Sequence, residues 1–231
     1  MNITRIHKTV GMIKQWIYAS KYEKHWLNRS RKMKQARTLN DKELNLLLLY
    51  IKTRRYAERD RLMTLFAYMA GMRIKEIVSL TIKDVLGIDG EIKNEINLSA
   101  EMTKGDKGRT VILSEKLKKE VKEYLYTLYT DSELIALTYS NKLNTPLFKT
   151  QKRSKFDPNT ACYHFHMLYK NAGLDGASSH SGRRSFITNL SKKGVALKVI
   201  MELVGHKNLQ TTQRYIDVTM DMKKSAVNLI N

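Results

Sequence analysis

The chain has 231 residues, of which 42% are hydrophobic, so it can bury at least one sizeable core and is not a disordered basic tail. Its 42 Lys and Arg outnumber 22 Asp and Glu, and the net charge of +20 predicts a polyanionic partner. The longest apolar run, Leu46 to Ile51, is far shorter than the ~20 residues of a membrane span. The N-terminus has no apolar signal-peptide core, and the single cysteine excludes an internal disulfide framework. We therefore expect a soluble, cytoplasmic protein that does not contact a membrane.

Positive charge is concentrated at the start of the chain. Residues 1–38 hold ten Lys or Arg and one Glu, and four aromatic residues interleave with the lysines at helical spacings. We expect a basic N-terminal arm over 1–38 rather than a complete domain, and it either lies along a nucleic acid or packs on the body as a solvated helix. Asn40, with Glu43 three residues later, predicts a capping box that begins the body, residues 39–231.

The apolar spacing of the body is mostly helical. Apolar residues recur at i, i+3 and i+4 in "DKELNLLLLYIKT", "RDRLMTLFAYMAG" and "RIKEIVSL". The period then shifts toward two over Glu95–Leu98 and Arg109–Leu113, with glycines between them, which predicts a small antiparallel hairpin with a basic tip. The predicted fold class is mainly α with a small antiparallel β-sheet. After Ser114 helices resume, pause in a polar loop over 140–158, and continue as "NTACYHFHMLYKNAG", "GRRSFITNLSKKG", "ALKVIMELVG", "NLQTTQRYID" and a last short helix after Thr219.

Polar residues gather at the ends of these elements. Each alone has an ordinary explanation, such as a helix cap, a solvated lysine or a core tyrosine. Together they fit a site that transfers a phosphoryl group without a set of metal ligands. The six residues are Arg73, Lys104, His180, Arg183, His206 and Tyr215.

Three of the six would stabilise charge on the phosphate. A phosphodiester under attack accumulates negative charge on its non-bridging oxygens, and guanidiniums hold such oxygens in bidentate geometry. Arg73 and Arg183 are the candidates for this contact. His206, which follows a glycine at a helix boundary, would donate a further hydrogen bond to the phosphate.

The other three would move protons and form the covalent bond. A tyrosine has an unperturbed pKa of about 10, so it attacks phosphorus only when cations stabilise the phenolate and a base takes its proton. We assign Tyr215 as the nucleophile and His180 as the base. Lys104, on the hairpin tip, would protonate the departing 5′ oxygen of the cleaved strand, and Lys107 is the alternative acid on the same tip.

Four stretches resemble the conserved boxes of the tyrosine recombinases, also called lambda-type integrases. They are "GMRIKEIVSLTIKDV", "TKGDKGRTVIL", "SSHSGRRSFITNLSKKGV" and "LVGHKNLQTTQRYIDV", and the resemblance covers roughly residues 39–220. It implies the recombinase catalytic-domain fold, double-stranded DNA as partner, and a 3′-phosphotyrosyl bond to Tyr215. It also implies a homo-oligomer, a tetramer on paired sites, with neither a metal nor a nucleotide cofactor. Glu76 matches the acidic residue of the first box and would buttress the site, and a salt bridge on the helix surface is the alternative.

The chain departs from the family pattern in two places. The 38 residues of the arm are too few for the helical core-binding domain that usually precedes the catalytic one, so we expect a partial DNA clamp or one completed by other protomers. Arg184 stands where the family often has histidine, and we expect it to support rather than catalyse. The last segment, "MDMKKSAVNLIN", is either a frayed tail or, as in the family, a segment that docks on a neighbouring protomer.

The resemblance implies a site-specific DNA recombinase that cleaves and rejoins DNA strands by integration, excision or inversion. Two other functions and one other kind of site are alternatives. A type IB topoisomerase shares the chemistry but does not pair two sites, and a non-cleaving DNA-binding regulator could keep the fold. All six catalytic positions are filled, which argues against the regulator. Zinc is disfavoured at Cys162, His164 and His166, because residues two apart on a helix do not share a face and zinc sites usually need four ligands.

Overall fold

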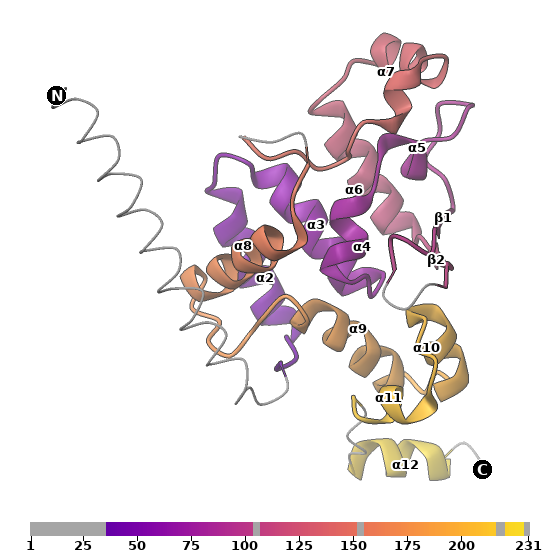
Figure 1. Cartoon of the computed structure of the whole chain (residues 1–231). Helices are drawn as coiled ribbons and strands as arrows, with labels where there is room; N and C mark the ends of the chain where they lie inside the picture. The colour runs from indigo at the N-terminus through magenta and orange to yellow at the C-terminus, as the bar shows by residue number, and fades with distance from the viewer. Residues whose placement is uncertain (1–35, 104–106, 152–154, 216–219, 229–231) are drawn as a thin grey trace, which may run out of the picture. The chain divides into compact units, whose positions relative to one another are not determined.

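The computed structural model describes residues 36–103, 107–151, 155–215 and 220–228. Helices dominate, and two short strands form an antiparallel sheet, which confirms the predicted fold class (Figure 1). The elements are α2 Asp41–Lys52, α3 Ala57–Met69, α4 Ile74–Ser79, α5 Ile82–Val85, β1 Glu95–Leu98, β2 Arg109–Ile112, α6 Glu115–Tyr126, α7 Asp131–Thr138, the 3₁₀ helix η1 Asn141–Asn144, α8 Pro158–Asn171, α9 Ser181–Lys192, α10 Leu197–Val204, α11 Leu209–Gln213 and α12 Met220–Asn228.

The body begins with the predicted capping box. Asn40 accepts a hydrogen bond from the Glu43 backbone N–H at 2.9 Å, and the Glu43 carboxylate accepts one from the Asn40 N–H at 3.0 Å. Arg37, counted in the basic arm, pairs with Glu43 at 2.6 Å and donates to the Asp175 carbonyl at 2.7 Å. Arg37 therefore contacts the body through α2 and through the Asp175 carbonyl, and the compact unit that contains α2 begins at Arg37. Residues 1–35 of the predicted arm lie outside the described residues.

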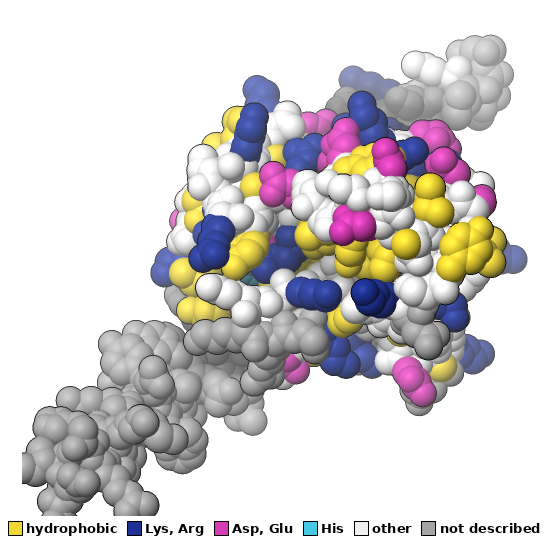
Figure 2. Space-filling model, turned by 90° about the horizontal axis from the view of Figure 1, so that it is seen from above, with side chains coloured by type: hydrophobic (Ala, Val, Ile, Leu, Met, Phe, Trp, Pro, Cys, Tyr) yellow, Lys and Arg dark blue, Asp and Glu magenta, His cyan; other side chains and the backbone are white. Residues whose placement is uncertain are grey.

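The face seen from above in Figure 2 carries charges of both signs. Dark blue basic side chains lie among magenta acidic ones there, with hydrophobic side chains between them. This mixture means that the excess positive charge of the chain is not concentrated on that face.

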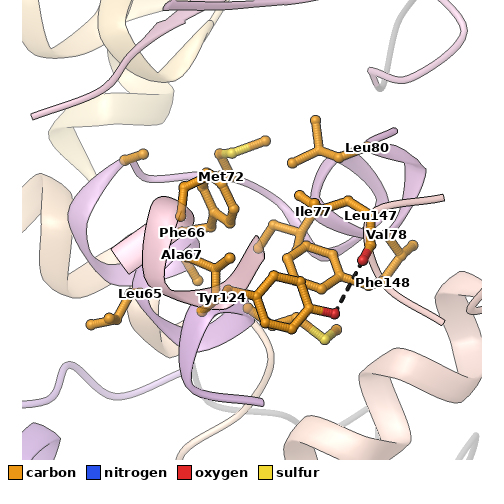
Figure 3. Packing of buried hydrophobic residues seen from close by; sticks show 14 of the residues in the cluster. Leu65, Phe66, Ala67, Met72, Ile77, Val78, Leu80, Tyr124, Leu147 and Phe148 are labelled. Carbon is orange, nitrogen blue, oxygen red and sulfur yellow. Dashed lines mark hydrogen bonds between the residues drawn. The ribbon is translucent and has the colours of Figure 1, made fainter. Parts of the chain in front are cut away.

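The main core lies where α3 contacts α6 and α9. Figure 3 shows residues of α3, α4 and α6 meeting the segment that contains Leu147 and Phe148. The Phe66 and Phe148 rings meet edge to face at 6.2 Å, and the Tyr124 hydroxyl donates to the Leu147 carbonyl at 3.1 Å. Because α3 is buried on nearly all sides from Leu62 to Ala67, it is the central helix against which the others are placed.

A second, smaller core joins α9 to α10. Ile187, Ile200 and Val204 are fully buried there, and Tyr215 packs against them. Helix α9 approaches α3 closely at Gly182, where an added Cβ would lie 2.9 Å from the Ala67 Cβ. This close approach places the first turn of α9 beside the end of α3.

Several boundaries differ from those expected. The strand predicted to end at Leu113 ends at Ile112, and the polar loop over 140–158 contains the 3₁₀ helix η1. Helix α11, expected to reach Asp217, ends at Gln213, because the Tyr215 N–H bonds to the Thr212 carbonyl at 3.0 Å in a tighter i to i−3 turn. Within the described ranges every helix is too short or too polar to span a lipid bilayer.

Candidate active site

The candidate residues stand at helix ends that converge beside α3. Gly71 ends the α3 region with a φ of +60°, a conformation that L side chains rarely adopt. A Cβ on Gly71 would also lie 2.5 Å from the Phe186 ring. This turn delivers Arg73, the N-cap residue of α4, to the same region as the first turn of α9.

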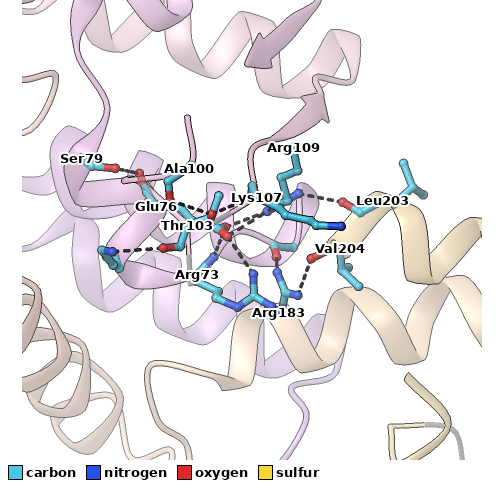
Figure 4. A network of polar contacts seen from close by, with 12 residues as sticks. Arg73, Glu76, Ser79, Ala100, Thr103, Lys107, Arg109, Arg183, Leu203 and Val204 are labelled. Carbon is cyan, nitrogen blue, oxygen red and sulfur yellow. Dashed lines mark hydrogen bonds and ion pairs between the residues drawn. The ribbon is translucent and has the colours of Figure 1, made fainter. Parts of the chain in front are cut away.

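Glu76 lies at the centre of a polar network (Figure 4). Its carboxylate is fully buried and accepts from the Arg73 Nη1 at 2.9 Å, the Arg73 backbone N–H at 2.8 Å and the Arg109 Nη2 at 2.7 Å. Burial would raise the pKa of this carboxyl, but the hydrogen bonds and charge of Arg109, with the Arg73 N–H, hold it below its usual value. Glu76 is therefore a carboxylate shared by two guanidiniums, and the expectation that it buttresses Arg73 agrees with these contacts.

Arg183 is both a candidate phosphate ligand and a structural bridge. Its side chain is buried, with Nη1 donating to the Gly71 carbonyl at 2.5 Å and Nη2 to the Val204 carbonyl at 2.6 Å. A guanidinium has five N–H donors, and these two contacts use two of them. Burial, with the nearby charge of Arg73, lowers the pKa of Arg183 to about 9, which leaves it protonated at neutral pH. Arg183 thus ties the end of α3 to the end of α10, a role that the sequence did not predict.

His206 is buried and uncharged at neutral pH. Its Nδ1 lies 2.9 Å from the Thr212 Oγ1. Burial, together with the charges of Arg183 and Arg73, lowers the pKa of His206 to about 4. In the tautomer in which Thr212 donates to Nδ1, the ring carries its proton on Nε2, where it can donate to a phosphate oxygen.

Tyr215 lies against His206. The two rings stack with centroids 5.8 Å apart and planes 22° apart. The Arg184 guanidinium lies 5.6 Å from the Tyr215 ring centroid, and the Thr188 hydroxyl donates to the Tyr215 carbonyl at 3.0 Å. The structure therefore brings the proposed nucleophile to the residue that was expected to hold the phosphate.

His180 and Lys104 complete the set of six predicted residues, and Lys107 is the alternative to Lys104. His180 is the exposed N-cap residue of α9, three residues before Arg183. Lys104 lies outside the described residues. Lys107 is exposed, and its carbonyl accepts a hydrogen bond from the Thr103 hydroxyl at 2.7 Å. Four of the six predicted residues, Arg73, Arg183, His206 and Tyr215, are thus joined to one another by direct contacts or through the ends of α3 and α10.

Sequence reasoning missed Arg109. This residue shares a strand face with the buried Val111, and its side chain is only 7% exposed. A charged residue on the buried face of a strand must find a partner, and that pattern was the available signal. Its partners are Glu76 and the Leu203 carbonyl.

One of the three residues considered for zinc, His164, makes a contact of another kind. Cys162, His164 and His166 all lie on α8, and the His164 Nε2 lies 3.0 Å from the buried Asp60 carboxylate. In the part of the chain that the structure describes, no three His, Cys, Asp or Glu side chains are grouped to hold a metal ion.

The sequence profile of the phage integrase family matches residues 37–222. The chain belongs to this family. It is 31% identical over 173 residues to the tyrosine recombinase XerA of Pyrococcus furiosus, a match that covers 75% of this chain and 55% of XerA. The family resemblance of the four boxes is confirmed.

Solved structures of the phage integrase family share this fold. The crystal structure of XerA recombinase superposes with a TM-score of 0.62 and 25% identity, covering 84% of this chain and 65% of that one. The XerH site-specific recombinase, bound to its palindromic difH substrate after cleavage, gives a TM-score of 0.59 and 27% identity, with 82% and 51% covered. The fold is that of a tyrosine recombinase catalytic domain, and the chain spans about half to two thirds of the length of these relatives.

Proposed function

We propose that the protein is a site-specific DNA recombinase that cleaves and rejoins DNA strands through a 3′-phosphotyrosyl intermediate. The observation that carries the proposal is the placement of Tyr215 against neutral His206, close to the charges of Arg183 and Arg73. A nucleophile beside fixed cations and a neutral donor is suited to attack on a phosphodiester. Membership of the phage integrase family supports the same reaction.

In the proposed reaction the Tyr215 Oη attacks phosphorus, and His180 takes the phenol proton. The bond from phosphorus to the 5′ oxygen breaks, and Lys104 gives that oxygen a proton. A 5′-hydroxyl from a second strand then attacks the phosphotyrosine, which restores the phosphodiester and releases Tyr215. Because the covalent bond conserves the energy of the phosphodiester, the reaction as written uses neither a metal nor a nucleotide cofactor.

The partner would be double-stranded DNA, with a homotetramer on two paired sites. The face of Figure 2 carries acidic as well as basic side chains, so it attracts DNA phosphates less than a purely basic face would. Arg73 and Arg183, held at the converging helix ends, are the favourable place for a phosphate. The division into an arm over 1–38 and a catalytic domain over 39–231 is part of this proposal.

The test traps the covalent adduct. Protein is incubated with fragmented DNA of the organism that encodes it, and fragments that remain bound in SDS are sequenced to map the cleaved site. The wild type should give an adduct at a defined site, and Tyr215→Phe should give none while binding DNA nearly as well, because only the hydroxyl is lost. Tyr163→Phe, a change at a 59% exposed tyrosine of α8, is the matched control and should keep the adduct.

The same protein and the mapped DNA site also distinguish a recombinase from the two alternative functions. A recombinase joins strands from two DNA molecules, whereas a type IB topoisomerase only relaxes supercoils in one. A non-cleaving regulator binds without any adduct. An adduct that persists in Tyr215→Phe would refute the assignment of the nucleophile.

A further inference from the structure

Arg109 stands at the start of β2 and reaches away from the hairpin into the polar network of Figure 4. Its Nη2 and Nε lie 2.7 and 3.3 Å from the two Glu76 carboxylate oxygens, and its Nη1 donates to the Leu203 carbonyl at 2.8 Å. One planar guanidinium therefore connects three elements, β2, α4 and α10.

The contact of Arg109 with Glu76 affects Arg73. Glu76 accepts from both guanidiniums, so the single buried carboxylate is balanced by Arg109 as well as by Arg73. If Arg109 were neutral, Glu76 would pair with Arg73 alone. The Arg73 guanidinium would then turn toward the carboxylate, and its positive charge would be less available to a phosphate.

The contact of Arg109 with the Leu203 carbonyl affects the position of His206. Leu203 lies in the last turn of α10, directly before the Val204 carbonyl that binds Arg183. Gly205 follows with a φ of +63°, and a Cβ on Gly205 would lie 2.5 Å from the Arg109 Cδ. The Arg109 side chain thus packs against the turn from which His206 begins.

We infer that Arg109 is a positioning residue that fixes Arg73 and His206 relative to each other and joins both to the strand that follows Lys104. It acts through Glu76 and the α10 backbone rather than by contacting the substrate. The inference rests on the proposed strand-cleavage function, because it assigns Arg109 a part in that reaction.

The test compares cleavage of two substrates built on the mapped site. One has an ordinary scissile phosphate and the other a methylphosphonate, in which a methyl group replaces one non-bridging oxygen and removes the negative charge. A neutral phosphorus centre gains less from a well-placed Arg73. Single-turnover adduct formation is measured with saturating protein on both substrates.

Arg109→Met should slow cleavage of the ordinary phosphate by about 10- to 100-fold, because a small misplacement of catalytic groups has an effect of this size. The loss on the methylphosphonate should be clearly smaller. Arg109→Lys keeps the charge but cannot bridge a carboxylate and a carbonyl with a planar fork. It should therefore also lose more cleavage rate on the ordinary phosphate than on the methylphosphonate, by a smaller factor than Arg109→Met. This second variant keeps the test decisive if Arg109→Met does not fold.

Arg61→Met is the matched control, because Arg61 makes a similar two-nitrogen contact to Glu120, at 2.7 and 2.5 Å, away from the site. Its effect should be the same on both substrates. Equal losses on both substrates in the Arg109 variants would overturn the inference and leave Arg109 a structural residue. A wild type without any adduct would instead overturn the proposed function, and the inference with it.

Discussion

The imidazole of His206 and the phenol ring of Tyr215 stack at 5.8 Å although they stand on opposite sides of α11 in the chain. The short helix between them folds back so that Thr212, in its last turn, reaches the His206 Nδ1. Histidine, threonine and tyrosine therefore form one local unit, and the orientation of the His206 ring depends on the Thr212 hydroxyl.

Replacing Thr212 with Val tests this unit. The change keeps the shape of a fully buried side chain but removes the hydrogen bond to Nδ1, so we expect about 1 kcal/mol of lost stability. Adduct formation should fall by about tenfold, because the Nε2 proton is no longer fixed toward the phosphate. Thr212→Ser should recover most of the rate, and Thr211→Val, at the exposed neighbour, should change little. Equal rates in wild type and Thr212→Val would show that the hydroxyl does not orient the ring.

The pH dependence of stability follows from the neutral state of His206. Its pKa of about 4 is below the usual 6.5, so the unfolded chain binds more protons than the folded one between these values. The contribution of His206 to the free energy of unfolding has its full value above pH 6.5 and is lost as the pH falls toward 4. Wild type should lose about 2 kcal/mol of unfolding free energy between pH 7 and 5 through this group, and His206→Asn should not show that loss. Urea titrations at both pH values measure the difference, and parallel curves for the two proteins would contradict the assignment.

Gly205→Ala should damage the site more than an alanine at another left-handed glycine. Both Gly205 and Gly194 have positive φ, but a Cβ meets the Arg109 side chain at Gly205 and nothing within 4 Å at Gly194. Each change should cost roughly 1–2 kcal/mol from backbone strain. Only Gly205→Ala should also slow adduct formation in protein that remains folded. Matching rates in the two variants would mean that the Arg109 contact does not matter to the site.

The proton donor can be assigned with a substrate whose 5′-bridging oxygen is replaced by sulfur. Sulfur leaves without a proton, so Lys104→Ala should slow cleavage of the ordinary substrate far more than of the phosphorothiolate. Lys107→Ala should affect both substrates alike. If the two variants exchange these behaviours, Lys107 is the acid.

The basic arm is tested by a salt titration of DNA binding. The deletion should remove residues 1–36 and spare Arg37, because Arg37 contacts Glu43 and Asp175. If four or five arm residues touch phosphates, the log-log salt slope should flatten by about four units, at about 0.9 per contact. Preference for the target over random duplex should persist better than affinity, because phosphate contacts position a protein and base contacts specify the site. An unchanged slope would mean that the arm's charge is solvated and does not contact DNA.

The sequence alone determined the local features of this protein. Hydrophobic periodicity and the capping pair Asn40 and Glu43 predicted the helices, and the shift to a period of two, with Gly108 near the tip, predicted the hairpin. These features are set by residues a few positions apart, so they can be predicted without the fold. The four boxes also identified the family and the six candidate residues, because their residue types and order reflect the chemistry.

Only the tertiary structure decided how these residues are held. The Arg109 bridge joins residues 33 and 94 positions away, and Arg183 spans 112 positions to reach Gly71. Whether the Tyr215 ring stacks on His206, and whether His206 is neutral, depends on how α9, α10 and α11 pack beside α3. Burial and the summed field of three arginines exist only once distant segments have met, so no local pattern in the sequence encodes them.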